Sequence, residues 1–113
     1  AVTDDLEAGQ ASLQREIARY SGGSHYQNFF RNTGFDAEMA GAQSARDHAD
    51  NPATAAAIGE NMQSELGVVG PADVCRARIE QLREMGLAKP VIAPLVVGEM
   101  KESYERTILA LAP

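Results

Sequence analysis

The segment of residues 90–97, PVIAPLVV, restricts the possible folds of this chain more than any other stretch. A nearly continuous apolar run of this kind is typical of a strand that is buried on both faces of a parallel sheet. Because proline cannot donate a backbone hydrogen bond, Pro90 and Pro94 limit regular pairing to residues 91–93. A buried parallel strand needs neighbouring strands. The sequence offers one further candidate, LGVVG at residues 66–70, which is a strand or a loop. The chain therefore has too few strands to enclose this one.

The rest of the sequence predicts a mostly α chain, with about four to five helices and one or two short strands. The first helix is expected to begin around Thr3 or Asp4, because acidic residues favour a first turn, and the glycines after Ser21 end it. Ser24 and Gln27 form the pattern of a capping box, which predicts a second helix that runs to Gly34. The apolar stripe of the first helix consists of Leu6, Leu13, Ile17 and Tyr20.

Proline and glycine also delimit the later helices. An alanine-rich stretch from residue 36 is expected to be helical up to a break near Pro52, and one further helix is expected over residues 53–66, with Gly59 as its weak point. Pro71 opens the strongest helix and Gly86 ends it. In that helix, the apolar face is expected to hold Cys75, Ile79 and Leu82. In the last helix, which starts near residue 99, the inner face is expected to hold Met100, Tyr104, Ile108 and Leu111.

Composition excludes several classes of function. The 113 residues carry a net charge of −6, so no basic surface for nucleic acid is expected. No apolar run approaches the roughly 20 residues that a membrane-spanning helix needs. The single cysteine, Cys75, cannot form an internal disulfide and suits a reducing compartment, so the expected location is the cytoplasm. The length fits a single segment, residues 1–113.

Three stretches carry a resemblance to a known family. They are AVTDDLEAGQASLQREIARY at the start, SHYQNFFRNTGF after it, and GPADVCRARIEQLREMGLAKPVIAPLVVGEMKESYERTILALAP at the end. Together they resemble the C-terminal part of the luciferase-like monooxygenase family. In the second stretch, Tyr26, Gly34 and Phe35 match the pattern of that family, while His25 replaces its asparagine.

The resemblance implies a (β/α)8 TIM barrel whose oxidoreductase chemistry uses a flavin, FMN, or the deazaflavin F420. A full barrel needs about 250 residues, at about 30 residues for each βα unit. The chain would then supply about the last third of such a barrel, as C-terminal βα units with a helical insertion. The catalytic groups and most cofactor contacts of the family would lie in the missing part, so we expect no catalytic residue in this chain.

The resemblance places a substrate pocket near the helical insertion, where the mouth of the barrel would lie. His25, Tyr26 and Phe30 are the candidate pocket residues. The alternative is that His25 is an ordinary first-turn residue and that the aromatic residues are packing. Gly23 and Ser24 precede a helix and are candidates to bind a phosphate of FMN or F420. The alternative is that the glycine merely ends the preceding helix.

Other chemically active residues have simpler interpretations. Cys75 lies on an apolar helix face, which is typical of an unreactive packed thiol. His48 is expected on the surface, without the partners that a metal site requires. Asp4, Asp5 and Glu7 are expected to cap the first helix rather than bind a metal. No metal site is predicted.

Two hypotheses for function follow. The first is a fragment of a luciferase-like oxidoreductase, which is inactive by itself and whose partner is the remainder of the barrel. The second is a stand-alone helical interaction or assembly module, which buries residues 90–97 against a partner or in a homo-oligomer. Neither includes nucleic acid or a membrane as a partner, and both predict that the chain is not monomeric.

Overall fold

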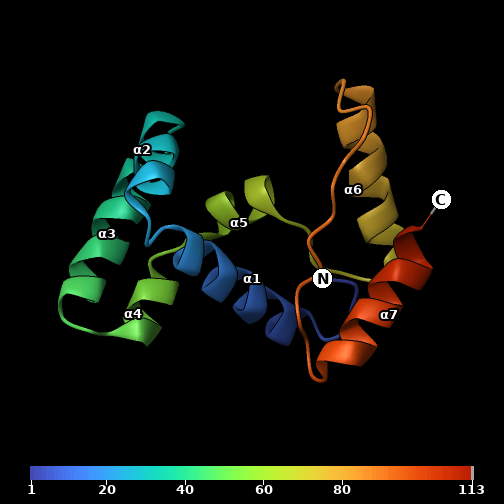
Figure 1. The fold of residues 1–113 in the computed structure, drawn as a ribbon, viewed down its shortest axis with the longest axis horizontal. Helices are drawn as coiled ribbons and strands as arrows, with labels where there is room; N and C mark the ends of the chain where they lie inside the picture. Colours follow the sequence, from blue (N-terminus) through green and yellow to red (C-terminus); the bar gives the residue numbers. More distant parts are fainter. Residues whose placement is uncertain (113) are drawn as a thin grey trace. The chain divides into compact units, whose positions relative to one another are not determined.

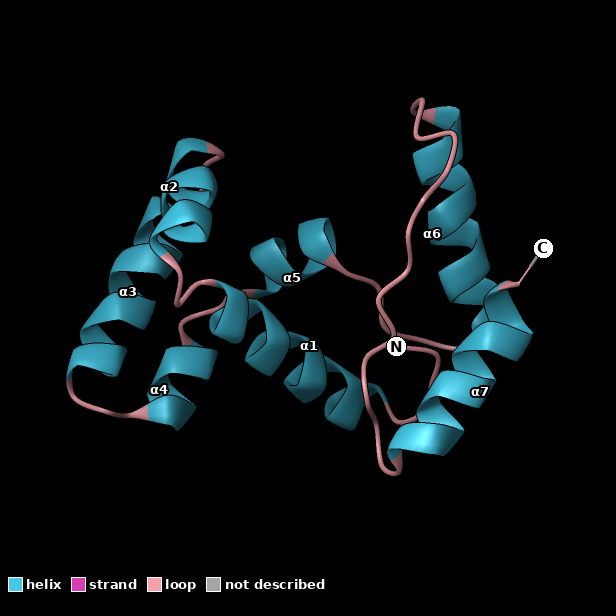
Figure 2. Ribbon diagram, viewed as in Figure 1, coloured by secondary structure: helices cyan, strands magenta, loops and turns pink. Residues whose placement is uncertain are grey.

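The computed structural model describes residues 1–112 and is mostly helical, which confirms the predicted class (Figure 1; Figure 2). The described residues hold seven helices instead of the four to five expected: α1 (Leu6–Tyr20), α2 (Ser24–Asn32), α3 (Asp36–Asp47), α4 (Asn51–Ala56), α5 (Glu60–Leu66), α6 (Ala72–Glu84) and α7 (Met100–Leu111). One reason for the higher number is Gly59, which adopts extended backbone before α5 and divides the single helix that was predicted for residues 53–66.

The chain forms two compact units. Unit 1 consists of Ala1–Leu13 together with the chain from Val68 onward, and unit 2 is the continuous segment Gln14–Gly67. The boundary between them lies inside α1, so the first half of this helix belongs to unit 1 and the second half to unit 2. Unit 1 is therefore built from two segments that are distant in the sequence.

Unit 1 is closed by a short parallel pairing of backbone segments. Residues 1–3 lie beside residues 68–70, with Val2 opposite Gly70. The N–H of Thr3 donates to the carbonyl of Gly70 at 2.9 Å, and the N–H of Gly70 donates to the carbonyl of Ala1 at 3.1 Å. A third bond joins the Ala1 amino group to the carbonyl of Val68 at 2.6 Å. Each paired segment leads directly into a helix, α1 or α6. The expected LGVVG strand is thus limited to this single bridge.

The strand predicted at residues 91–93 does not form. Within residues 1–112 no backbone group of residues 88–95 takes part in a hydrogen bond, and Figure 2 shows a loop from α6 to α7. The side chain of Val91 is 96% exposed. The prediction was wrong because the apolar pattern indicates a strand only if the sheet around it is present.

Side-chain hydroxyls hold the end of this loop. Ser12 Oγ donates to the carbonyl of Val96 at 2.8 Å. Ser103 Oγ accepts from the N–H of Val97 at 3.0 Å and donates to its carbonyl at 2.8 Å. Ser103 is 2% exposed, so these bonds satisfy backbone groups that would otherwise be costly to bury.

The same contacts explain why the predicted inner face of α7 was wrong. Met100, Tyr104 and Ile108 are exposed and Leu111 is half-buried, whereas Ser103 and Thr107 are the buried residues of this helix. Thr107 Oγ1 donates to the carbonyl of Ser103 at 2.8 Å. α7 turns Ser103 inward because Val97 of the neighbouring loop presents both its N–H and its carbonyl there. It also packs on α6, where Arg76 donates to the carbonyl of Ala110 at 3.0 Å.

Unit 2 is a helical cluster in which α3 packs against α2 and α4 (Figure 1). Its buried apolar side chains are Ile17, Ala18, Phe30, Phe35, Met39, Ala42, Ile58 and Met62. The carbonyl of Ile58, which lies between α4 and α5, accepts bonds from Gln14 and Gln63 at 3.0 Å each. Arg46 reaches from α3 to the end of α1 and donates to the Ala18 carbonyl at 3.2 Å. Polar side chains thus satisfy the helix ends that unit 2 buries.

Gly9 in α1 brings this helix close to the parallel pairing of unit 1. A Cβ at position 9 would overlap Cγ1 of Val69 and would lie 3.0 Å from Cγ2 of Thr3. Valine is stiff about its first side-chain torsion, so Val69 cannot easily move away. The glycine is therefore needed for the close approach of helix and extended segment.

We expect Gly9→Ala to destabilise the chain by about 1–2 kcal/mol, because overpacking outweighs the helix propensity gained. Thermal unfolding followed by circular dichroism measures the effect. The matched control is Gly9→Ala combined with Val69→Ala, which removes the overlapping methyl groups. The double variant should unfold at nearly the same temperature as Val69→Ala alone. A higher melting temperature for Gly9→Ala would contradict the close packing of α1 on residue 69.

Candidate functional site

The start of α2 differs from the predicted capping box. Gly23, with φ −87° and ψ 136°, is the N-cap, and Ser24 is the first helical residue. No side chain caps this end, and the Gln27 N–H donates to the carbonyl of Gly23 at 3.0 Å. The Gln27 side chain instead donates to Gln43 of α3 at 2.9 Å. The prediction was wrong because Gln27 finds a tertiary partner and Ser24 lies one position too late to cap.

The phosphate candidates Gly23 and Ser24 are both exposed at this uncapped helix start. No acidic side chain lies in the first turn of α2. The backbone N–H groups of a first turn carry partial positive charge, which favours an anion. These features are compatible with a phosphate, but any uncapped helix start shares them.

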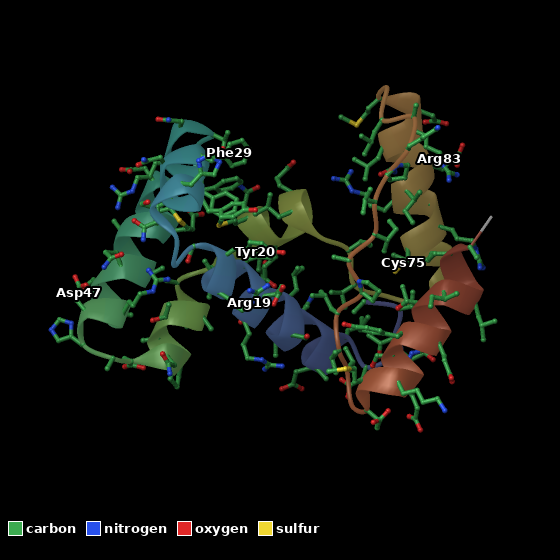
Figure 3. The ribbon with its side chains drawn as sticks, in the orientation of Figure 1. Arg19, Tyr20, Phe29, Asp47, Cys75 and Arg83 are labelled. Atoms are coloured by element: carbon green, nitrogen blue, oxygen red, sulfur yellow. The ribbon has the colours of Figure 1, made fainter. Side chains whose placement is uncertain are left out.

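An aromatic cluster covers the turn from α1 to α2 and the first turns of α2. We define it as Tyr20, His25, Tyr26, Phe29 and Phe30, and Figure 3 shows Tyr20 at the end of α1 and Phe29 on α2. Tyr26 is its centre: its ring lies 5.1 Å from Tyr20, 5.7 Å from His25 and 6.1 Å from Phe30, between centroids. The first two contacts are edge-to-face, the arrangement that the ring quadrupoles favour. Phe29 meets Phe30 at 5.7 Å.

The three predicted pocket residues lie together in this cluster, but they differ in burial. Phe30 is 6% exposed and belongs to the core of unit 2, whereas His25 and Tyr26 are exposed. The packing alternative therefore describes Phe30, and the exposed part of the cluster consists of Tyr20, His25, Tyr26 and Phe29. The packing residue and the surface residues of the cluster therefore differ in exposure and not in aromatic character.

Arg19 is the charged group beside the cluster. Its guanidinium carbon lies 4.6 Å from the centroid of the Tyr20 ring, in cation–π contact. Two bonds join Arg19 to Glu16, at 3.0 and 2.6 Å. The bond from Arg19 lowers the pKa of Glu16, and the same bond raises the pKa of Arg19. Both side chains are accessible to solvent, so the pair fixes the position of Arg19 but adds little to stability.

The other chemically active residues are placed as structural elements. Cys75 is buried, with its sulfur 3.4 Å from the carbonyl of Gly70, and burial raises the pKa of its thiol. A raised pKa keeps the thiol protonated, so it is a poor nucleophile. His48 is exposed and contacts the Ser44 carbonyl at 2.8 Å. Asp5 caps α1 by accepting from the Ala8 N–H at 3.0 Å, which confirms capping by one of the predicted acids.

Several polar residues of the two units were not predicted. The most important are Ser12, Ser103 and Thr107, which hold the end of the α6–α7 loop and the buried face of α7. The spacing of Ser103 and Thr107, four residues apart, places them on one helix face. That spacing is a signal for a polar inner face, but only a known backbone partner would distinguish it from an exposed face.

The described residues contain no group of three or more His, Cys, Asp or Glu side chains that could hold a metal ion. None of the helices described, over residues 1–112, has the length and apolar character to cross a membrane. Comparison with models of protein families, with curated proteins and with solved structures finds no match to this chain. Function must therefore be inferred from the chain's own residues.

Substitutions in the aromatic cluster separate packing from surface roles. We expect Phe30→Ala to cost about 3–5 kcal/mol of unfolding free energy, because it leaves a cavity in unit 2. Tyr26→Ala should cost about 1–3 kcal/mol, because its contacts with Tyr20 and Phe30 contribute about 0.5–1.5 kcal/mol for each pair. His25→Ala should change stability by less than about 0.5 kcal/mol. Urea unfolding measures all three. An equal cost for Tyr26→Ala and Phe30→Ala would show that Tyr26 is a core residue as well.

Proposed function

We propose that this chain is the C-terminal part of a luciferase-like oxidoreductase and that it is inactive without the rest of the barrel. The observation that carries the proposal is the parallel pairing of residues 1–3 with residues 68–70, each followed by a helix. Parallel neighbours that are each followed by a helix are the repeating unit of a (β/α)8 barrel. The three stretches that resemble the family cover the same segments.

The loop from α6 to α7 supports the same proposal. Its apolar residues 90–97 precede α7, so the order of an apolar segment and a helix occurs a third time in unit 1. All-parallel sheets are covered by helices on their faces and bury their strands. Here Val91 and Ile92 are exposed instead. An incomplete sheet accounts for both the apolar sequence and its exposure.

In the complete protein, the cofactor would be FMN or F420, and it would supply hydride transfer or oxygen chemistry. Gly23 and Ser24 are the residues of this chain that would face its phosphate, through the uncapped N–H groups at the start of α2. His25, Tyr26 and Phe29 would offer ring faces to an apolar or aromatic substrate, with Phe30 as the buried support. The catalytic groups would lie in the remainder of the barrel, which is the partner of this chain.

The first test of this proposal is the size of the native polypeptide, measured by blotting source cells with an antibody against this chain. We expect a band near the mass of a barrel of about 250 residues or more. The whole protein should quench or shift the fluorescence of FMN or F420 on titration, and the isolated chain should not. A native band at 12.1 kDa would contradict the proposal.

A charge substitution in the whole protein tests the phosphate position separately. Ser24→Glu should lower cofactor affinity at least tenfold, because a carboxylate repels phosphate while it remains favourable at a helix start. Asn28→Glu adds the same charge to an exposed position farther along α2 and is the matched control. An equal effect of both substitutions would overturn the phosphate assignment but not the barrel proposal.

A second candidate function is a stand-alone assembly module that pairs with its own copy. Exposed apolar side chains of unit 1 favour it, since Met85, Val91 and Leu109 are 79%, 96% and 84% exposed. Large apolar groups in solvent are typical of surfaces that associate.

If the chain assembles in this way, light scattering should detect an oligomer. Val91→Glu should dissociate it, and Ala88→Glu, which adds the same charge to an exposed residue of the same loop, should not. A monodisperse 12.1 kDa species before any substitution would rule out this module.

A further inference from the structure

α7 carries an apolar stripe that the rest of residues 1–112 leaves exposed to solvent. Met100, Tyr104 and Ile108 follow one another at intervals of four residues, which places them on one face of the helix. All three side chains are exposed. The helix is held on unit 1 by another face, that of Ser103 and Thr107. Exposed apolar residues that gather on one face are typical of surfaces that associate.

Two charged residues line one flank of this stripe. Lys101 and Glu105 each follow a stripe residue directly, and Lys101 Nζ lies 3.8 Å from Glu105 Oε1. Both side chains are largely exposed, so this pair adds little to stability and stays accessible to a partner. α7 as a whole is neutral within a chain of net charge −6, because its two bases balance its two acids. Two copies of this helix can therefore approach without net repulsion between the helices.

The stripe and its flanking charges are self-complementary about Tyr104. A two-fold axis perpendicular to α7 at this residue makes the second copy antiparallel and keeps each flank on its own side. Met100 then lies opposite the partner's Ile108, and Tyr104 lies opposite the partner's Tyr104. Lys101 and the partner's Glu105 share one side and differ by about 3 Å along the helix axis. Symmetry repeats this contact, so opposite charges meet twice.

A parallel pair of helices lacks this match. In that arrangement the flank of Lys101 and Glu105 faces the opposite flank of the partner helix. That opposite flank holds Ser103 and Thr107, which are buried and carry no charge. The pattern of charges therefore favours a second copy of this chain as the partner, in the antiparallel orientation.

We propose that two copies of this chain pair through α7 in an antiparallel, two-fold symmetric contact. This inference goes beyond the proposed function, because α7 lies outside residues 90–97 and the contact needs neither a barrel nor a cofactor. A helix of 12 residues is about 18 Å long, so the contact lies at the small end of specific interfaces, below about 1,200 Å² in total. The dimer should therefore be in exchange with the monomer.

Charge exchange tests the pairing, by sedimentation equilibrium of the 113-residue chain at about 10 μM to about 1 mM. Lys101→Glu and Glu105→Lys should each weaken the dimer about tenfold, because like charges then face each other. General charge repulsion predicts the opposite for Glu105→Lys, which makes the chain less acidic. An equal mixture of the two variants should form a heterodimer at least tenfold tighter than either homodimer.

The mixture separates contacts between helices from contacts within α7. Both variants lose the ion pair of Lys101 with Glu105 inside the helix, so a change of helix stability cannot produce tighter pairing on mixing. Circular dichroism should show unchanged helix content, since both positions are exposed. A mixture that pairs no better than the separate variants would overturn the proposal.

A second pair of variants tests the apolar stripe. Ile108→Glu should weaken the dimer at least tenfold. Leu109→Glu adds the same charge to the next residue, which is also exposed but lies about 100° around the helix, and should weaken it less than about threefold.

Two results would overturn pairing through α7. The first is a dimer that Val91→Glu dissociates and Ile108→Glu does not, which would assign association to the α6–α7 loop. The second is an unsubstituted chain that stays monomeric at about 1 mM. Neither measurement involves a cofactor, so this pairing and the barrel proposal can fail separately.

Discussion

The structure depends on three backbone hydrogen bonds that join residues 1–3 to residues 68–70. They close a loop of 67 residues between Ala1 and Val68. The length-dependent part of that closure costs about 4 kcal/mol, while three ordinary hydrogen bonds contribute about 1.5–4.5 kcal/mol in total. Hydrogen bonding alone therefore only balances closure. Burial of Val2, Cys75 and Ile79 must supply the surplus that keeps unit 1 together.

Because these hydrogen bonds only offset the entropy of loop closure, the pairing of residues 1–3 with residues 68–70 depends on close packing around it. Gly9 lets α1 approach Val69, and Gly70 itself has φ 159°. Cys75 follows in the first turns of α6, 1% exposed. A short parallel segment that lacks a full sheet is stabilised by the helices that cover it. Each helix must then lie close to the backbone that it protects.

Much of the fold was predictable because proline and glycine mark the helix ends locally. Pro71 and Gly86 delimit α6 within a residue or two, and Leu13, Ile17 and Ile79 are buried as their spacing predicts. Leu6 and Tyr20, at the two ends of the predicted stripe of α1, are exposed instead. The inner face of α7 was not predictable, since Ser103 turns inward only to meet the Val97 backbone. The strand at residues 91–93 failed for a related reason. An apolar pattern shows that a segment is suited to burial. It does not show whether the neighbouring strands that would bury the segment are present.

In the candidate site too, local features were predictable from the sequence and contacts between helices were not. The spacing of Tyr26 and Phe30, one helical turn apart, predicts that the rings meet on one face of α2. It cannot predict which ring is buried, because that depends on how unit 2 packs against each residue. The cap of α2 moved from Ser24 to Gly23 since Gln27 binds Gln43 of another helix. Interactions between helices, unlike helix ends, leave no local signal in the sequence.

The division of the chain into a continuous unit and a divided one sets an order for folding during synthesis. All residues of unit 2 are available once residue 67 has left the ribosome. Unit 1 cannot form at that point, because residues 1–13 must wait for Val68 and the segments after it to emerge. Ribosomes add about 5–20 residues each second, so the roughly 45 residues from 68 to 112 take on the order of 2–9 s. During that interval Val2 and Leu13 have no core to enter. In that interval the nascent chain holds a helical cluster, residues 14–67, that can fold, while residues 1–13 still lack the segments they pack against.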